Sequence, residues 1–268
     1  MIRQRIITGV IAAVLLLGLL FAAPTEVTRI VIAALFVVAA WEWSAFLKTS
    51  MTLRYVYVAI FAALLLPNVI WDSWTVDREG AWMLALAWWA GALIWIFFYP
   101  TRIARPIAWL AGALVLLPAY VALDWLYQLG PEMLLFMLAI VLAADIGAYF
   151  AGKTFGRVKL APQISPGKTW EGAIGGMLGV TALISIESVV FGFSLAAMLP
   201  LALAVGMISI VGDLTVSMFK RDTGVKDSGT LFPGHGGFLD RADSITAAAP
   251  LFSLGISWLD PSILGLVS

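Results

Sequence analysis

Residues suited to binding phosphate and metal ions gather in one polar stretch of the C-terminal half, KRDTGVKDSGTLFPGHGGFLDRAD, residues 220–243. Its bases are Lys220, Arg221, Lys226 and Arg241, and its acids are Asp222, Asp227, Asp240 and Asp243. Carboxylates suit a hard cation such as Mg²⁺, whereas ammonium and guanidinium groups suit phosphate oxygens. The glycines of PGHGG let the backbone approach a ligand closely. The stretch therefore predicts a site for a metal ion and a polyphosphate, and the alternative is a solvated loop held by salt bridges.

The helix that leads into this stretch carries an acid, a hydroxyl and two cations on one face, at spacings i, i+4, i+7 and i+8. These residues are Asp213, Ser217, Lys220 and Arg221. Such a face does not suit lipid, so it predicts an aqueous or ligand-filled cavity. Asp145 likewise lies in the inner part of a helix that runs into a second polar segment. Glu42 and Glu187 lie nearer the ends of their helices, where an acid can reach the surface, and are assigned no role.

The second polar segment, residues 152–171, contains SPGKTW. Ser165, Lys168 and Thr169 offer hydroxyl and ammonium groups that can grip phosphate. The pattern is not a P-loop, because Pro162 stands where the first glycine is needed and no strand is expected before it. The alternative is a basic surface loop that only sets the membrane topology.

The chain has one histidine, His235, which lies within the glycines of the polar stretch. A phosphate monoester is already ionised near neutral pH, so a reaction with such a nucleophile needs no general base. We therefore expect His235 to position or contact phosphate, and a structural role is the alternative.

The composition is that of a membrane protein. Of the 268 residues, 62% are hydrophobic and 12% are charged, and the mean hydropathy is +0.99. The absence of cysteine excludes disulfides, thiolate metal sites and thiol nucleophiles. The formal net charge is zero, so bulk electrostatics gives no indication of nucleic-acid binding, and none is expected.

Hydropathy predicts an all-α, polytopic bundle of about nine transmembrane helices, each near the length that crosses the hydrocarbon. The predicted segments are 6–23, 30–47, 53–71, 81–99, 107–127, 132–151, 172–192, 195–217 and 244–266. Residues 172–179, GAIGGMLG, are small enough for close helix packing in lipid. Residues 1–130 are expected to form an N-terminal scaffold of about five helices. Residues 131–268 are expected to form the catalytic region, with loops at 152–171 and 218–243.

The distribution of Lys and Arg sets the orientation. With the N-terminus in the cytoplasm, 14 of the 16 Lys and Arg residues fall on inner segments, and only Arg29 and Arg78 lie outside. The long polar segments then lie on the cytoplasmic face, where nucleotides and metal ions are available. The first apolar segment also resembles a signal peptide, but we expect a retained helix, because it is long enough to span and more spans follow.

Residues 217–243 read S-x-F-K-R-x4-K-D-x-G-x2-F-P-G-H-G-G-F-x-D-R-x-D, a pattern that resembles the signature of the phosphatidate cytidylyltransferases, also called CDP-diacylglycerol synthases. The patterns D-x2-A-Y-x2-G-x3-G at 145–156 and L-A-P-x-I-S-P-G-K-T-W-E-G at 160–172 extend the resemblance, which covers about 140–245. Ala242 departs from the family, which usually has a larger apolar residue or Thr there. This difference concerns packing rather than chemistry.

The resemblance implies the reaction of CTP with phosphatidic acid to give CDP-diacylglycerol and pyrophosphate, at the cytoplasmic face of the inner (plasma) membrane. It also implies Mg²⁺, with a second cation as an option, and a homodimer, which the residues themselves do not address. The implied metal ligands are Asp213 and Asp240, with Asp145 and Asp243 as further contributors. The expected catalytic residues are Asp213, Asp240, Lys220, Arg221, Lys226 and Asp227. The expected substrate-binding residues are Ser165, Lys168, Thr169, Ser217, His235 and Arg241.

Two other functions are open at this point. In a proton- or ion-coupled transporter, Asp145 and Asp213 would carry ions, but the paired broken helices of an inverted repeat are not evident in the sequence. A CTP-dependent enzyme acting on another lipid phosphate would share the same motifs. A membrane scaffold does not account for two phosphate-suited segments on one face.

Overall fold

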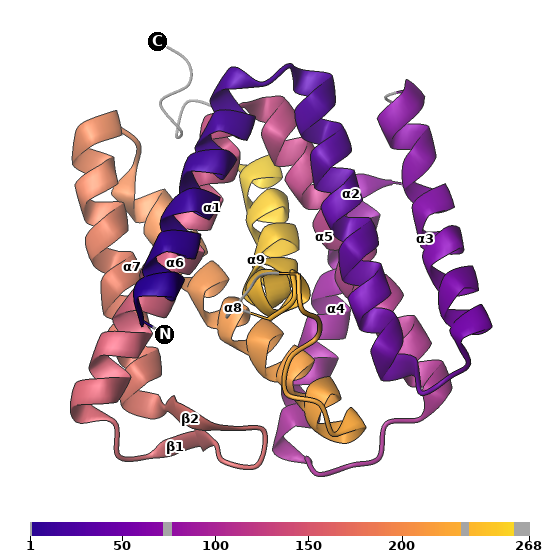
Figure 1. Cartoon of the computed structure of the whole chain (residues 1–268). Helices are drawn as coiled ribbons and strands as arrows, with labels where there is room; N and C mark the ends of the chain where they lie inside the picture. Colours follow the sequence, from indigo (N-terminus) through magenta and orange to yellow (C-terminus); the bar gives the residue numbers. More distant parts are fainter. Residues whose placement is uncertain (1, 72–76, 232–235, 260–268) are drawn as a thin grey trace.

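The computed structural model of the chain describes residues 2–71, 77–231 and 236–259. In this part of the chain the structure is helical apart from one short β-hairpin (Figure 1). The elements are α1 (Ile2–Ala22), α2 (Thr25–Ser44), the 3₁₀ turn η1 (Ala45–Leu47), α3 (Met51–Trp71), α4 (Arg78–Phe97), α5 (Arg105–Leu129), α6 (Pro131–Phe155), β1 (Lys159–Ala161), β2 (Ser165–Thr169), α7 (Trp170–Phe191), α8 (Leu195–Thr223) and α9 (Leu239–Trp258).

Each of the helices α1 to α9 overlaps one of the segments predicted from hydropathy. Within the described residues, seven of them, α2 to α8, are long and apolar enough to cross a membrane. In α1, the apolar stretch whose side chains are described is Gly9–Ala22. The all-helical, multi-pass membrane fold is therefore confirmed with seven candidate spans, while a count of nine spans stays a prediction.

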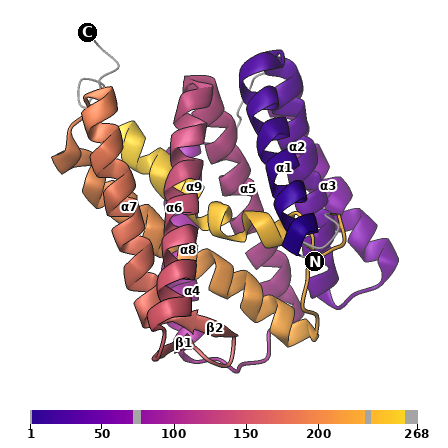
Figure 2. The same cartoon turned by 60° about the vertical axis from the view of Figure 1, so that its left-hand side comes forward.

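Helix α9 differs from its predicted segment, because it begins at Leu239 rather than at residue 244. The acids Asp240 and Asp243 thus lie on the helix itself and not in the loop before it. Farther along, the side chains of Ala247, Ala248 and Ala249 are fully buried. These small residues let α4, α5 and α8 pack against α9, which runs through the middle of the bundle (Figures 1 and 2). The predicted residues 260–266 lie outside the described part of the chain.

Helices α6 and α7 pack together through glycine and alanine, as the small-residue pattern predicts. A Cβ atom at Gly147 of α6 would overlap the backbone carbonyl of Gly175 on α7. A Cβ atom at Gly175 would in turn overlap the side chain of Ala151. This close approach fixes the position of the polar residues near the C-terminal end of α6.

The predicted loop at 152–171 is largely ordered secondary structure. Helix α6 continues to Phe155, and β1 pairs antiparallel with β2, with Lys159 opposite Thr169. Thr169 then caps α7, since its Oγ1 accepts a hydrogen bond from the N–H of Gly172 at 3.1 Å. The hairpin lies at the end of the molecule opposite the α1–α2 connection (Figures 1 and 2).

A buried polar cluster joins α2, α3 and α5 in the N-terminal half. Asp124 is fully buried and accepts from Arg29 Nε at 2.8 Å and from Asn68 Nδ2 at 2.8 Å. Gln128 adds a third donor at 2.7 Å. A buried carboxylate is tolerated when its oxygens are paired in this way.

Candidate active site

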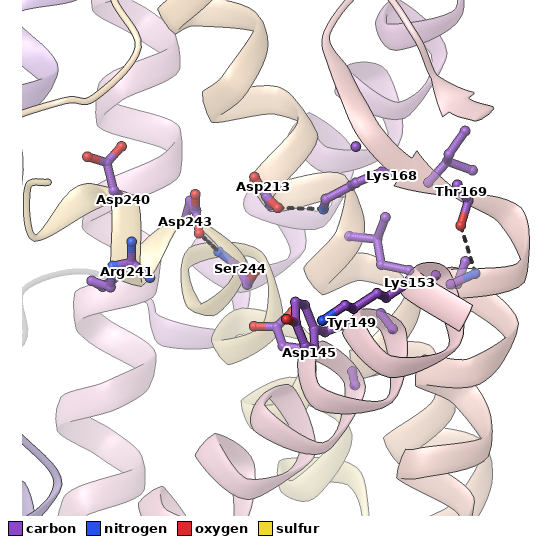
Figure 3. A pocket seen from close by; sticks show the side chains of 18 of the residues that line it. Asp145, Tyr149, Lys153, Lys168, Thr169, Asp213, Asp240, Arg241, Asp243 and Ser244 are labelled. Atoms are coloured by element: carbon purple, nitrogen blue, oxygen red, sulfur yellow. Dashed lines mark hydrogen bonds and ion pairs between the residues drawn. The ribbon is translucent and has the colours of Figure 1, made fainter. Parts of the chain in front are cut away.

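A polar cavity of about 610 Å³ opens between α6, the hairpin, α8 and α9 (Figure 3). Acids and bases line it together. The acids are Asp145, Asp213, Asp227, Asp240 and Asp243, and the bases are Lys153, Lys168, Lys220 and Arg241. The residues come from segments nearly a hundred positions apart in the sequence, so the fold brings the two polar segments to one place.

Asp213, on α8, is held by residues from the hairpin and from its own helix. Lys168 Nζ of β2 lies 2.5 Å from Asp213 Oδ2 (Figure 3). Ser217 Oγ donates to Asp213 Oδ1 at 3.2 Å, which is the i to i+4 spacing expected on this face. Asp243 of α9 lies beside this part of α8, because a Cβ atom at Gly212 would overlap the backbone carbonyl of Asp243. Asp213 and Asp243 therefore line the cavity at the junction of β2, α8 and α9.

Asp240, in the first turn of α9, is held by three donors. Lys220 Nζ lies 2.8 Å from Oδ1, and the N–H groups of Ser228 and Gly237 each donate to Oδ2 at 2.9 Å. The Lys220 ammonium and the two N–H groups are donors that favour the ionised form of this carboxylate. Asp240 thus presents a paired carboxylate to the cavity.

Residue types in the cavity suit a divalent cation, although no group of three or more Asp, Glu or His side chains gathers as a ready metal site in the described residues. Asp213 and Asp243 offer hard oxygen ligands of the kind Mg²⁺ prefers, and Asp145 and Asp240 line the same cavity. The cavity therefore has the donors for a metal ion, and Lys168 pairs with one of them, Asp213.

Helix α6 adds three cavity residues with polar or charged side chains, which share one face at i, i+4 and i+8. They are Asp145, Tyr149 and Lys153, and the Lys153 ammonium lies 5.6 Å from the centre of the Tyr149 ring. Only Asp145 is among the predicted site residues. The same face argument that groups Asp213 with Lys220 on α8 could have identified Tyr149 and Lys153.

Of the other predicted site residues, some line the cavity and some lie outside it. Thr169 and Asp227 line the cavity, whereas Ser165, Ser217, Arg221 and Lys226 are not among the described residues that line it. Arg221 instead donates from Nε to the carbonyl of Ile164 at 3.1 Å, so it braces the hairpin against α8. Lys226 is exposed in the segment after α8. His235 lies outside the described residues.

Two apolar cavities adjoin the polar one. A cavity of about 520 Å³ between α4, α7 and α8 shares Leu160, Ala173 and Ile210 with it. Another of about 530 Å³, between α1, α2, α6 and α9, shares Arg241. The polar site is therefore continuous with surfaces that suit hydrocarbon chains.

Comparison with known proteins shows similarity along nearly the whole chain. A sequence profile described as the cytidylyltransferase family matches residues 3–259. The chain is 39% identical to a phosphatidate cytidylyltransferase of Pseudomonas aeruginosa over 270 residues, which cover 94% of this chain and 96% of the relative. It is 35% identical to one of Haemophilus influenzae over 285 residues, covering 94% and 98%. One of Brucella abortus is 43% identical over 143 residues, covering 52% of each chain. The similarity thus extends well beyond the motifs at about 140–245.

Proposed function

Since the chain belongs to the cytidylyltransferase family, we propose that it is a phosphatidate cytidylyltransferase, which makes CDP-diacylglycerol and pyrophosphate from CTP and phosphatidate. The observation that carries this assignment is one cavity that joins five acids and four bases beside apolar surfaces, in a chain similar to such enzymes over 94% of its length. A polar cavity at lipid-facing helices suits a reaction between a soluble nucleotide and a membrane lipid.

In this reaction a phosphate oxygen of phosphatidate attacks the α-phosphorus of CTP. A new P–O bond forms to the lipid phosphate, the bond to the β-phosphate oxygen breaks, and pyrophosphate leaves with the electron pair. The attacking phosphate is already ionised near neutral pH, so no side chain has to remove a proton. The main barrier is repulsion between anions, so catalysis depends on alignment and on neutralising charge.

The cations of the cavity are placed to perform this neutralisation. Lys168 and Lys220 approach from β2 and α8, and Lys153 approaches from α6. We assign these three lysines to the triphosphate of CTP, because they surround the carboxylates at the centre of the cavity. Ammonium groups suit this role, since each can follow a phosphate oxygen without a fixed fork geometry.

Asp213 and Asp243 would hold Mg²⁺, and Asp240 and Asp145 are near enough to the same cavity to contribute. When bound, the ion would polarise phosphate oxygens and offset the negative charge that develops as pyrophosphate leaves. Asp240 has a further part, since its bond with Lys220 orients that ammonium toward the cavity.

Arg241 is assigned to the phosphate of the lipid, because it borders both the polar cavity and the apolar cavity behind α1. The acyl chains of phosphatidate would lie along apolar residues of that second cavity, such as Leu16, Leu138 and Ile245. This arrangement leaves the lipid tails in hydrocarbon while the head group meets the bases.

We further propose that α1 and α9 complete nine membrane helices with the N-terminus in the cytoplasm. The Lys and Arg distribution supports this orientation, and it puts the hairpin and the cavity on the cytoplasmic face of the inner membrane. Homodimer formation stays a proposal from the family resemblance.

Purified protein in detergent or vesicles should release pyrophosphate from CTP only when phosphatidate and Mg²⁺ are both present. The measurement compares CTP with ATP, GTP and UTP, and phosphatidate with other lipid phosphates. Faster conversion of another lipid phosphate would reassign the substrate. Absence of cytidylyl transfer from any lipid phosphate, together with ion flux across vesicles, would replace the enzyme with a transporter.

Arg241→Ala is expected to raise KM for phosphatidate about 10- to 100-fold, because it removes a charge-assisted hydrogen bond to the lipid phosphate. KM for CTP should change less than about 3-fold, since the nucleotide is assigned to the lysines. Initial rates with each substrate varied in turn measure both constants. Arg54→Ala is the control, because that arginine stacks on Trp41 at 4.6 Å, away from the cavity. An equal rise of both KM values would contradict the assignment of Arg241.

A further inference from the structure

Glu42, near the C-terminal end of α2, is a buried acid outside the polar cavity. Only 5% of the residue is exposed. Its Oε1 accepts from the N–H of Phe238 at 2.9 Å, and its Oε2 accepts from the N–H of Leu239 at 2.7 Å and from Ser228 Oγ at 3.0 Å. Two of these donors belong to the segment that joins α8 to α9 and the third to the first residue of α9, nearly 200 positions later in the sequence.

These bonds supply the N-terminal cap that α9 lacks locally. Phe238 is the N-cap residue of α9, and its own side chain makes no capping hydrogen bond. The first N–H groups of a helix have no partner within the helix and carry partial positive charge. The Glu42 carboxylate meets this need from another helix, so it fixes where α9 begins.

Glu42 and Asp240 hold the same two points of the connecting segment. At the first point, the Ser228 hydroxyl binds Glu42 while the Ser228 N–H binds Asp240. At the second, the N–H of Phe238 binds Glu42 while the N–H of the preceding residue, Gly237, binds Asp240. The donors that orient Asp240 are therefore themselves held in place by Glu42.

Two glycines of the family pattern are explained by the same carboxylate. A Cβ atom at Gly229 or at Gly237 would overlap the Glu42 carboxylate. The close approach of Glu42 to the backbone thus favours glycine at both positions, since a larger residue would displace the carboxylate from its donors.

We propose that Glu42 is a positioning residue for cytidylyl transfer, which holds Ser228, Phe238 and Leu239 so that Asp240 and Arg241 face the cavity. The proposal rests on the function proposed above. It goes beyond the motifs in the C-terminal half, because it gives the N-terminal helices a part in the geometry of the site.

The test is Glu42→Gln, which keeps the size of the side chain but turns one acceptor oxygen into an NH₂ group that faces a donor. We expect kcat for pyrophosphate release to fall about 10- to 100-fold, the usual effect of losing one hydrogen bond to a charged group. KM for CTP should rise less than KM for phosphatidate, because Lys153 and Lys168 lie on α6 and β2, whereas Arg241, assigned to the lipid phosphate, follows Asp240 on α9. A kcat within about 2-fold of wild type in the folded variant would overturn the proposal.

Asp124→Asn is the matched control, because Asp124 is an equally buried carboxylate with side-chain donors in the N-terminal half. It should lower thermal stability with little effect on kcat per folded molecule. If Glu42→Gln lowers kcat only as far as Asp124→Asn does at equal loss of stability, Glu42 is structural and the proposal fails.

A double-mutant cycle separates positioning from independent effects. If Glu42 acts through Asp240, the variant with both Glu42→Gln and Asp240→Asn should be about as slow as Asp240→Asn alone. Multiplication of the two effects would overturn the proposal.

Should Glu42→Gln not fold, Ser228→Ala provides a second test, because it removes one donor to Glu42. It should lower kcat several-fold, and wild-type kcat in that variant would count against the proposal. Inactivity of the wild-type chain would instead refute the proposed function.

Discussion

Asp213→Asn should lower kcat for cytidylyl transfer by about 10²- to 10³-fold in a protein that remains folded. The substitution removes a charge at the place where Asp243, Lys168 and Ser217 converge, and asparagine is a weaker ligand for Mg²⁺. The measurement is single-turnover formation of CDP-diacylglycerol, with a Mg²⁺ titration of each protein. We expect the variant to need a higher Mg²⁺ concentration for half-maximal activity.

Glu187→Gln is the control for Asp213→Asn. Glu187 is a partly buried acid of the membrane helix α7, but it does not line the polar cavity. Its replacement should leave both turnover and the Mg²⁺ titration unchanged. A folded Asp213→Asn protein with activity within about 3-fold of wild type, or an unchanged Mg²⁺ requirement, would remove Asp213 from the metal site.

Gly147→Ala should destabilise the protein by about 1 to 3 kcal/mol and sharply reduce the yield of folded enzyme. The added methyl group would overlap the carbonyl of Gly175, which cannot move aside as a flexible side chain could. Separation of α6 from α7 would also displace Asp145 and Lys153. Thermal unfolding followed by size-exclusion chromatography measures the change.

Gly91→Ala is the matched substitution for this experiment, because nothing lies within 4 Å of a Cβ atom built at Gly91 of α4. It should leave stability unchanged or raise it slightly, since alanine favours a helix more than glycine does. An equally stable Gly147→Ala protein would show that α6 and α7 can separate without cost, contrary to the packing described above.

The helices could be predicted because hydropathy is a local property of the chain. Each of the nine segments overlaps a helix of the described chain, and the differences in their ends fall where polar residues interrupt the pattern. Helix α9 begins earlier than predicted because its first turn is stabilised by Glu42, which no local rule connects to Phe238. The hairpin was missed because its two short strands pair only with each other and carry no alternating pattern.

The candidate site was predictable in part, because motifs and helical spacing are also local properties of the sequence. Asp240 and Lys168 stand in motifs, and Asp213 shares a helical face with Ser217 and Lys220. The structure places Asp213, Asp240 and Lys168 around one cavity. Lys153 has the helical spacing that reveals it, although it lies outside the residues expected to act. Glu42 could not be found from the sequence, because its role depends on contacts made across nearly 200 positions by backbone groups. His235 and its place in the site stay a prediction.

The ion pairs of the cavity also bear on the cost of keeping acids inside a bundle of apolar helices. With Lys168 on Asp213 and Lys220 on Asp240, two of the acids carry their own counterions. Each pair spares the fold the cost of an uncompensated charge, and it keeps both lysine side chains in the cavity where the phosphates of a nucleotide would bind.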